Sequence, residues 1–143
     1  MVIAVDFDGT CVTHAFPKIG EDIGAVPVLK RLVKAGHKII LYTMRSHGKE
    51  GDSLHKTKSG QLIKNDTLQE AIDWFKDNDI PLYGVNENPD QKDWTTSPKI
   101  YAQYYIDDAA LGIPLIRFLG TDAPRPYVDW EIVEKLLEME GLI

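Results

Sequence analysis

Asp6 and Asp8 stand at the end of a short apolar run, in the stretch MVIAVDFDGTCV. A single acid at such a place is an ordinary turn or capping residue. Two acids spaced i and i+2 can converge as the chain leaves a strand, and Gly9 allows that turn because it has no Cβ atom. Converging carboxylates can hold a divalent cation, transfer protons or attack an electrophile.

Other residues that could share in this chemistry follow later apolar runs. Thr43 ends the run IILYT, and Arg45 comes two positions after it. Lys99 lies in SPKI, and the run YYIDD ends in Asp107 and Asp108. Each of these residues, taken singly, also has a plain structural interpretation as a strand end, a surface cation or a cap. The chemical interpretation therefore depends on their being brought together.

The elements that would position these residues alternate along the chain. Apolar runs rich in β-branched residues predict strands over 2–5, 37–43, 81–86 and 103–108, and a short fifth over 114–118. Apolar stripes at helical spacing predict helices over 25–35, 67–78 and 129–140. Thr67 followed by Glu70 is typical of a capping box at the start of the second helix. This alternation predicts a parallel sheet in a three-layer α/β/α sandwich.

In open parallel sheets, ligands bind beyond the carboxyl ends of the strands. Asp6, Thr43 and Asp107 all leave the predicted sheet at that edge. Two long segments without periodicity, 46–65 and 86–98, leave from it as well. Connections of this length in a compact domain are usually functional or disordered. The sequence therefore predicts that this edge carries the functional site.

The stretch DFDGT, at the end of the first apolar strand, resembles motif I of the phosphatase branch of the haloacid dehalogenase (HAD) superfamily. Thr43 resembles motif II, Lys99 is placed like motif III, and Asp107 with Asp108 is similar to motif IV. The motifs appear in the family order between positions 2 and 108. The resemblance implies a Rossmann-like HAD core, with residues 1–143 forming a single HAD-like hydrolase domain.

For catalysis, the resemblance implies a phosphatase that works through an aspartyl-phosphate intermediate. Asp6 would be the nucleophile, and Asp8 would protonate the leaving oxygen and later deprotonate the attacking water. Thr43 would hold a phosphate oxygen, and Lys99 would neutralise the phosphate, with Lys92 as the alternative. The transferred phosphoryl group carries concentrated negative charge, so its catalysis consists mostly of positioning and electrostatic stabilisation.

The resemblance also implies Mg²⁺ as the cofactor. Mg²⁺ prefers oxygen ligands and is usually held by one or two carboxylates together with water and substrate oxygens. The implied ligands are the Asp6 carboxylate, the Asp8 main-chain carbonyl and one acid of motif IV. Asp108 is favoured as the direct ligand and Asp107 as the residue behind it, although the sequence leaves the choice between them open.

Many members of the superfamily carry a separate cap domain that closes over the site. The segments 11–24 and 86–98, where a cap could be inserted, are too short for one, so the chain is expected to be a small capless member. Its extra length is 46–65, a segment with more cations than acids. It is predicted to be a basic flap that recruits an anionic substrate or a solvated loop. Arg45 is the strongest candidate for contacting a substrate phosphate.

Composition limits the partners. The net charge of −6 argues against non-specific nucleic-acid or membrane binding, and no apolar run is long enough for a membrane span. The lone Cys11 excludes an intrachain disulfide and favours a reducing compartment, so a cytoplasmic protein is expected. The expected partner is a small or bulky phosphate ester; nucleic acid is possible but not favoured. No feature points to a particular oligomeric state.

Two other functions remain open. The first is a phospho-accepting regulatory module without turnover, similar to a response-regulator receiver. The receiver's acceptor acid stands at the end of the third strand, whereas here that strand ends in GVNEN, and Asp8 supplies the acid/base that dephosphorylation needs. The second is a nucleic-acid end-processing phosphatase that uses the basic segment, and the acidic net charge argues against it.

Overall fold

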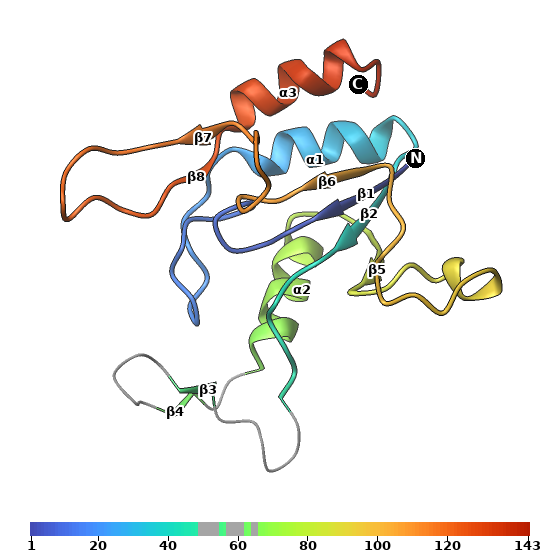
Figure 1. Ribbon diagram of the computed structural model, residues 1–143, viewed down its shortest axis with the longest axis horizontal. Coiled ribbons are helices and arrows are strands. Elements are labelled where there is room, and N and C mark those ends of the chain that lie inside the picture. The colour runs from blue at the N-terminus through green and yellow to red at the C-terminus, as the bar shows by residue number, and fades with distance from the viewer. Residues whose placement is uncertain (49–54, 57–61, 64–65) are drawn as a thin grey trace.

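Four parallel strands make the central sheet, in the order β5-β2-β1-β6 (Figure 1). They are β1 (Val2–Val5), β2 (Lys38–Leu41), β5 (Leu82–Val85) and β6 (Tyr104–Ile106). The computed structural model describes residues 1–48, 55–56, 62–63 and 66–143. The sheet confirms the predicted α/β fold class, and each of its strands lies within a range predicted from the sequence.

β1 lies between two partners in the sheet. Ile3 pairs with Ile39 of β2 on one side and with Tyr104 of β6 on the other, both in parallel register. Ile3 and Val5 are completely buried. A strand that is paired along both edges and covered on both faces explains why the run before Asp6 is uninterrupted by polar residues.

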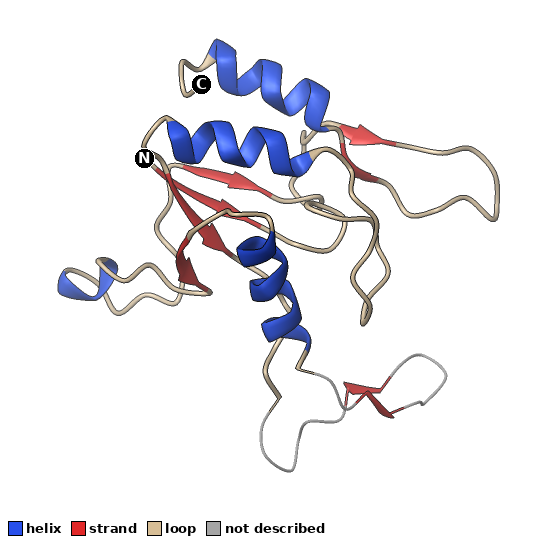
Figure 2. Cartoon of the chain, turned by 180° about the vertical axis from the view of Figure 1, so that it is seen from behind, coloured by secondary structure: helices blue, strands red, loops and turns tan. Residues whose placement is uncertain are grey.

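Helices cover both faces of the sheet. In Figure 1, α1 (Ala25–Lys34) and α3 (Trp130–Met139) lie together on one face, and α2 (Thr67–Asp77) lies on the other. The view from behind in Figure 2 shows the same arrangement. The helices bury their apolar sides in one core with the sheet, with Leu29, Phe75 and Val133 among the buried residues. This is the three-layer, Rossmann-like arrangement.

The start of α2 differs from the predicted capping box. Asp66 is the N-cap, and its carboxylate accepts a hydrogen bond of 2.9 Å from the backbone N–H of Gln69. Thr67 is instead the first residue of the helix, and its buried hydroxyl donates to the carbonyl oxygen of Ser46. The prediction placed the cap one residue too late because Thr67 and Glu70 have the capping spacing, whereas Asp66 makes the contact.

A small antiparallel hairpin precedes α3. It consists of β7 (Leu115–Ile116) and β8 (Tyr127–Val128), and it is separate from the central sheet. The strand predicted over 114–118 is therefore present, but it pairs with β8. The backbone N–H of Val128 donates to the carbonyl oxygen of Gly9 at 2.9 Å, which fixes the hairpin to the turn after β1.

The remaining connections are too short to form a separate domain. The segment 46–65 contributes the two-residue strands β3 (His55–Lys56) and β4 (Leu62–Ile63), and the rest of the predicted basic flap lies mostly outside the described residues. The connection from β5 to β6 contains a single 3₁₀ turn, η1 (Gln91–Asp93). In the described part of the chain there is no cap domain. No described helix combines the length and apolar character needed to cross a membrane.

Candidate functional site

A pocket of about 440 Å³ opens where β1, β2 and β6 end. It brings together the residues proposed from the sequence, with one exception. The predicted residues that line it are Asp6, Asp8, Thr43, Arg45, Asp107 and Asp108. Lys99 is the exception, and His14 and Arg125 also line the pocket.

Three of the carboxylates form a cluster. Carboxylate oxygens of Asp6, Asp107 and Asp108 all lie within 4.8 Å of one another. The parallel pairing of β1 with β6 causes this, because Val5 lies opposite Ile106 and the next residue of each strand is an aspartate. The backbone N–H of Asp6 also donates to the carbonyl oxygen of Ile106 at 2.9 Å. The cluster offers oxygen ligands at a spacing that one divalent cation can bridge.

The surroundings of Asp6 favour its protonated form. The pKa of Asp6 is raised from 3.8 to about 7, mainly by burial and in addition by the negative charges of Asp107 and Asp108. Hydrogen bonds from the backbone N–H of Phe7 and from the hydroxyl of Thr10 oppose this rise. A nearby cation would stabilise the charged form of the Asp6 carboxylate, so its raised pKa is consistent with a metal site.

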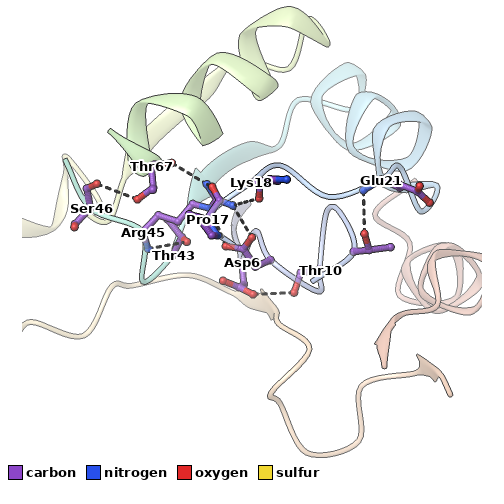
Figure 3. A network of polar contacts seen from close by, with 11 residues as sticks. Asp6, Thr10, Pro17, Lys18, Glu21, Thr43, Arg45, Ser46 and Thr67 are labelled. Carbon is purple, nitrogen blue, oxygen red and sulfur yellow. Dashed lines mark hydrogen bonds and ion pairs between the residues drawn. The ribbon is translucent and has the colours of Figure 1, made fainter. Parts of the chain in front are cut away.

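Thr10 connects the acids of β1 and β6. Its buried hydroxyl donates to Oδ2 of Asp6 at 3.0 Å (Figure 3). The same hydroxyl accepts a hydrogen bond of 3.0 Å from the backbone N–H of Asp108. The carbonyl oxygen of Thr10 accepts a hydrogen bond from the indole Nε1 of Trp130 at 2.6 Å. The turn after β1 is thereby held from both the sheet and α3.

Gly9 and His14 pack closely in the same turn. Gly9 has a φ of 78°, and a Cβ atom there would lie 2.1 Å from Nε2 of His14. His14 in turn places Nε2 2.9 Å from Oδ2 of Asp108, with both side chains mostly buried. Gly9 is therefore required both by the backbone conformation and by the approach of His14. The sequence showed His14 only as a residue close to motif I.

Asp8 is paired with Arg45. Nε of Arg45 donates to Oδ2 of Asp8 at 2.8 Å, and Nη2 donates to Oδ1 at 2.7 Å. The Arg45 side chain is 1% exposed, against 19% for Asp8. Its guanidinium group lies near two aromatic rings, 5.0 Å from the centre of Phe7 and 5.2 Å from that of Phe16. This is a buried, bidentate ion pair.

The other N–H groups of Arg45 bind main-chain carbonyls. Nη1 donates to the carbonyl oxygens of Pro17 and Thr67, and Nη2 donates to that of Lys18 (Figure 3). A guanidinium group has five N–H donors, and together with the two bonds to Asp8 all five are used. In this arrangement Arg45 has no donor left for a substrate phosphate, which corrects the sequence-based expectation for Arg45. Its observed role is to hold Asp8.

Thr43 is fixed by its neighbours. Its backbone N–H donates to Oδ1 of Asn86 at 2.8 Å, and its hydroxyl accepts a hydrogen bond from the backbone N–H of Arg45 at 3.2 Å. Asn86 follows β5 with a φ of 52°, a conformation that asparagine adopts more readily than most residues. Asn86 therefore helps to fix the backbone at Thr43.

Comparison with known proteins gives one informative match. No family model and no curated protein matches the chain. Among solved structures, a conserved protein from Bacteroides thetaiotaomicron is similar at 30% sequence identity and a TM-score of 0.69. The similarity covers 98% of this chain and 91% of that one. The chain belongs to the family of this conserved Bacteroides protein.

The chain does not bring its predicted lysine to the carboxylates. Lys99 is exposed and lines a separate hollow with Trp94, Tyr101 and Tyr105, and its Nζ lies 5.9 Å from the centre of the Tyr105 ring. The alternative, Lys92, lines a further hollow beside η1. The loop before β6 turns away from the pocket lined by the acids, which the spacing between Lys99 and the motif IV acids does not reveal.

The pocket contains a second arginine that no pattern in the sequence indicated. Arg125 lines it from the connection between β7 and β8 and is exposed. It lies in none of the motifs and has no periodic pattern around it, so no sequence signal identified it. Met44 and Phe16, both exposed, form an apolar part of the same lining.

Proposed function

We propose that the protein is a Mg²⁺-dependent phosphohydrolase of the HAD type that cleaves phosphate monoesters through an aspartyl-phosphate on Asp6. The observation that carries this proposal is the convergence of Asp6, Asp107 and Asp108 at the carboxyl edge of the sheet, with Asp8 in the same pocket. A nucleophilic carboxylate, an acid/base and a cation site are the parts that such a reaction requires.

The donor set fits Mg²⁺. Asp6 and Asp108 would hold the ion directly with the main-chain carbonyl of Asp8, and Asp107 would stand behind them. The clustering of three carboxylates and the raised pKa of Asp6 support this assignment, because a cation would offset the repulsion among these carboxylates. When bound, Mg²⁺ would supply charge neutralisation and polarise a phosphoryl oxygen.

The residues of this chain would then act in two steps. In the first, an oxygen of Asp6 forms a bond to phosphorus, the bond from phosphorus to the ester oxygen breaks, and Asp8 gives that oxygen a proton. In the second, Asp8 takes a proton from water, whose oxygen attacks phosphorus and releases phosphate and the free Asp6 carboxylate. The hydroxyl of Thr43 would hold a phosphoryl oxygen throughout. Cleavage and hydrolysis together return every group to its starting state.

The pairing of Asp8 with Arg45 favours one alternative, a protein that becomes phosphorylated and turns over slowly. Both oxygens of Asp8 accept hydrogen bonds from Arg45, so Asp8 must leave this pairing at least in part before one of its oxygens can turn toward a leaving group or a water. If release is rare, the phosphorylated form persists. Such a protein would be a phospho-accepting regulatory module.

Hydrolysis of a panel of phosphate esters tests the proposal. The panel runs from an aryl phosphate through sugar phosphates and nucleotides to oligonucleotide ends, each with Mg²⁺ and with a chelator. We expect Mg²⁺-dependent phosphate release that is abolished in Asp6→Asn and unchanged in Asp77→Asn, which removes an exposed carboxylate at the end of α2. Wild-type rates in Asp6→Asn would refute the proposal. A stoichiometric burst without turnover would favour the phospho-accepting module.

A further inference from the structure

The pocket contains an imbalance of charge. Four carboxylates line it, together with two guanidinium groups, those of Arg45 and Arg125. All five donors of Arg45 are used within the protein, and Lys99 lines another hollow. Within the described ranges, Arg125 forms no hydrogen bond or ion pair, so it is the arginine of the pocket that can still contact an anion.

The position of Arg125 is set by the hairpin and by the turn after β1. Arg125 lies two residues before β8, and the backbone N–H of Val128 donates to the carbonyl oxygen of Gly9. Trp130 then donates to the carbonyl oxygen of Thr10. The segment that follows Arg125 is therefore fixed at two points to the turn after β1, close to the candidate nucleophile Asp6. The connection between β7 and β8 loops away from the body of the molecule (Figure 1). Arg125 belongs to the end of this connection that leads into β8.

We propose that Arg125 binds the phosphoryl group of the substrate and takes the role that the sequence assigned to Lys99. The proposal rests on the phosphohydrolase function proposed above. The planar guanidinium group offers paired N–H donors that match two oxygens of a phosphate. A monoester has three terminal oxygens, so one remains for the hydroxyl of Thr43 when the fork binds the other two, whereas a diester has only two. Arg125 therefore selects terminal phosphate monoesters over diesters.

Binding of inorganic phosphate tests the role of Arg125 without depending on turnover. Isothermal titration in saturating Mg²⁺ would compare the wild type with Arg125→Gln, Arg125→Lys and Arg117→Gln. Arg117 is the matched control, because it is an exposed arginine of the same connection that does not line the pocket. We expect Arg125→Gln to weaken phosphate binding by about ten- to a hundredfold, as for loss of a hydrogen bond to a charged group. Arg125→Lys should lie between, since it keeps the charge and loses the fork.

The outcomes separate the two proposals. Unchanged phosphate binding in Arg125→Gln, equal losses in Arg125→Gln and Arg117→Gln, or no binding by the wild type would each overturn the assignment of Arg125. Ester hydrolysis at full rate in Arg125→Gln would overturn it too, while leaving the phosphohydrolase function standing. Arg125-dependent phosphate binding without hydrolysis of any ester would do the reverse. Thermal unfolding checks that each variant is folded. If Arg125→Gln lowers the midpoint of unfolding, phosphate binding by Arg125→Lys decides whether Arg125 binds phosphate.

Discussion

Arg45 donates hydrogen bonds to both carboxylate oxygens of Asp8, at 2.8 Å through Nε and 2.7 Å through Nη2. The pair joins the turn after β1 to the segment after β2, and further bonds from Arg45 reach the carbonyl oxygens of Pro17, Lys18 and Thr67. One buried side chain therefore connects four stretches of the chain around the pocket. Arg45 thus links these stretches through its bonds to carbonyl oxygens and fixes Asp8 through the ion pair.

Replacing Arg45 by methionine should destabilise the fold. The substitution leaves Asp8 without its partner and three carbonyl oxygens without their donor. Removing one member of a buried pair costs about 3–5 kcal/mol in the free energy of unfolding, and the partial exposure of Asp8 places the expectation at about 3 kcal/mol. Urea denaturation measures it. The control is Arg31→Met, because Arg31 is exposed and pairs with Glu134 and Glu138 at the surface. A loss in Arg45→Met no larger than that of the control would contradict the structural role.

The stability of the metal-free protein should fall as the pH rises from about 4 to above 7. The pKa of Asp6 is about 7 in the folded protein against 3.8 in the unfolded chain, so the folded state binds this proton more tightly. The contribution of Asp6 is fully present below pH 4 and is lost as the pH rises through 7. Asp6→Asn removes this dependence and should be the more stable protein at pH 8. Chemical denaturation in chelator, at a series of pH values, should show the difference between the two proteins growing over this range.

Mg²⁺ should stabilise the protein through the acid cluster. A ligand at a hundred times its dissociation constant raises the free energy of unfolding by about 2.7 kcal/mol. We expect this gain in the wild type, its near loss in Asp108→Asn and a smaller loss in Asp107→Asn. Thermal unfolding with and without Mg²⁺ at pH 8 measures it, and Asp77→Asn should respond like the wild type. A greater loss in Asp107→Asn than in Asp108→Asn would exchange their assigned places around the ion.

Asp8→Asn should affect substrates according to their leaving groups. An alkyl oxygen needs a proton when it leaves, whereas an aryl oxygen carrying electron-withdrawing groups leaves without one. General acid catalysis typically contributes about 10²–10⁴ in rate, so the first step should slow by that factor for alkyl phosphates only. Rapid-quench measurement of phosphoenzyme formation isolates this step from the later hydrolysis. Equal slowing for both classes would show that Asp8 acts in some other way than as an acid.

Much of the scaffold could be predicted from the sequence because its signals are local. The range of β1 follows from an apolar run, and those of α1 and α2 follow from stripes at helical spacing, which depend on neighbouring residues alone. The convergence of Asp6 with Asp107 could be predicted as well. Parallel strands of one sheet end at one edge, so acids at two strand ends are candidates for contact wherever the strands are neighbours.

The bonding of Arg45 and the place of Arg125 could not be predicted, because both depend on contacts between distant segments. Arg45 looked available for a substrate, yet its donors are taken by carbonyl oxygens whose positions no pattern in the sequence indicates. Lys99 has suitable spacing before β6, but the loop carries it to another hollow. Arg125 precedes β8, a two-residue strand that is too short to give a signal. The hairpin itself brings that arginine to the pocket.

The joining of β1 with β6 has a further consequence, for how the chain reaches its folded state. Thr10 and Asp108 are 98 residues apart in the chain, yet they form a hydrogen bond in the site. Contacts of such long range form late, because closing the loop between them costs entropy before it brings any gain. The carboxylates that meet there repel one another until a cation lies between them. A bound cation would link the end of β1 to the end of β6. The concentration of the cation would then govern how fast the chain folds as well as whether the folded protein is active.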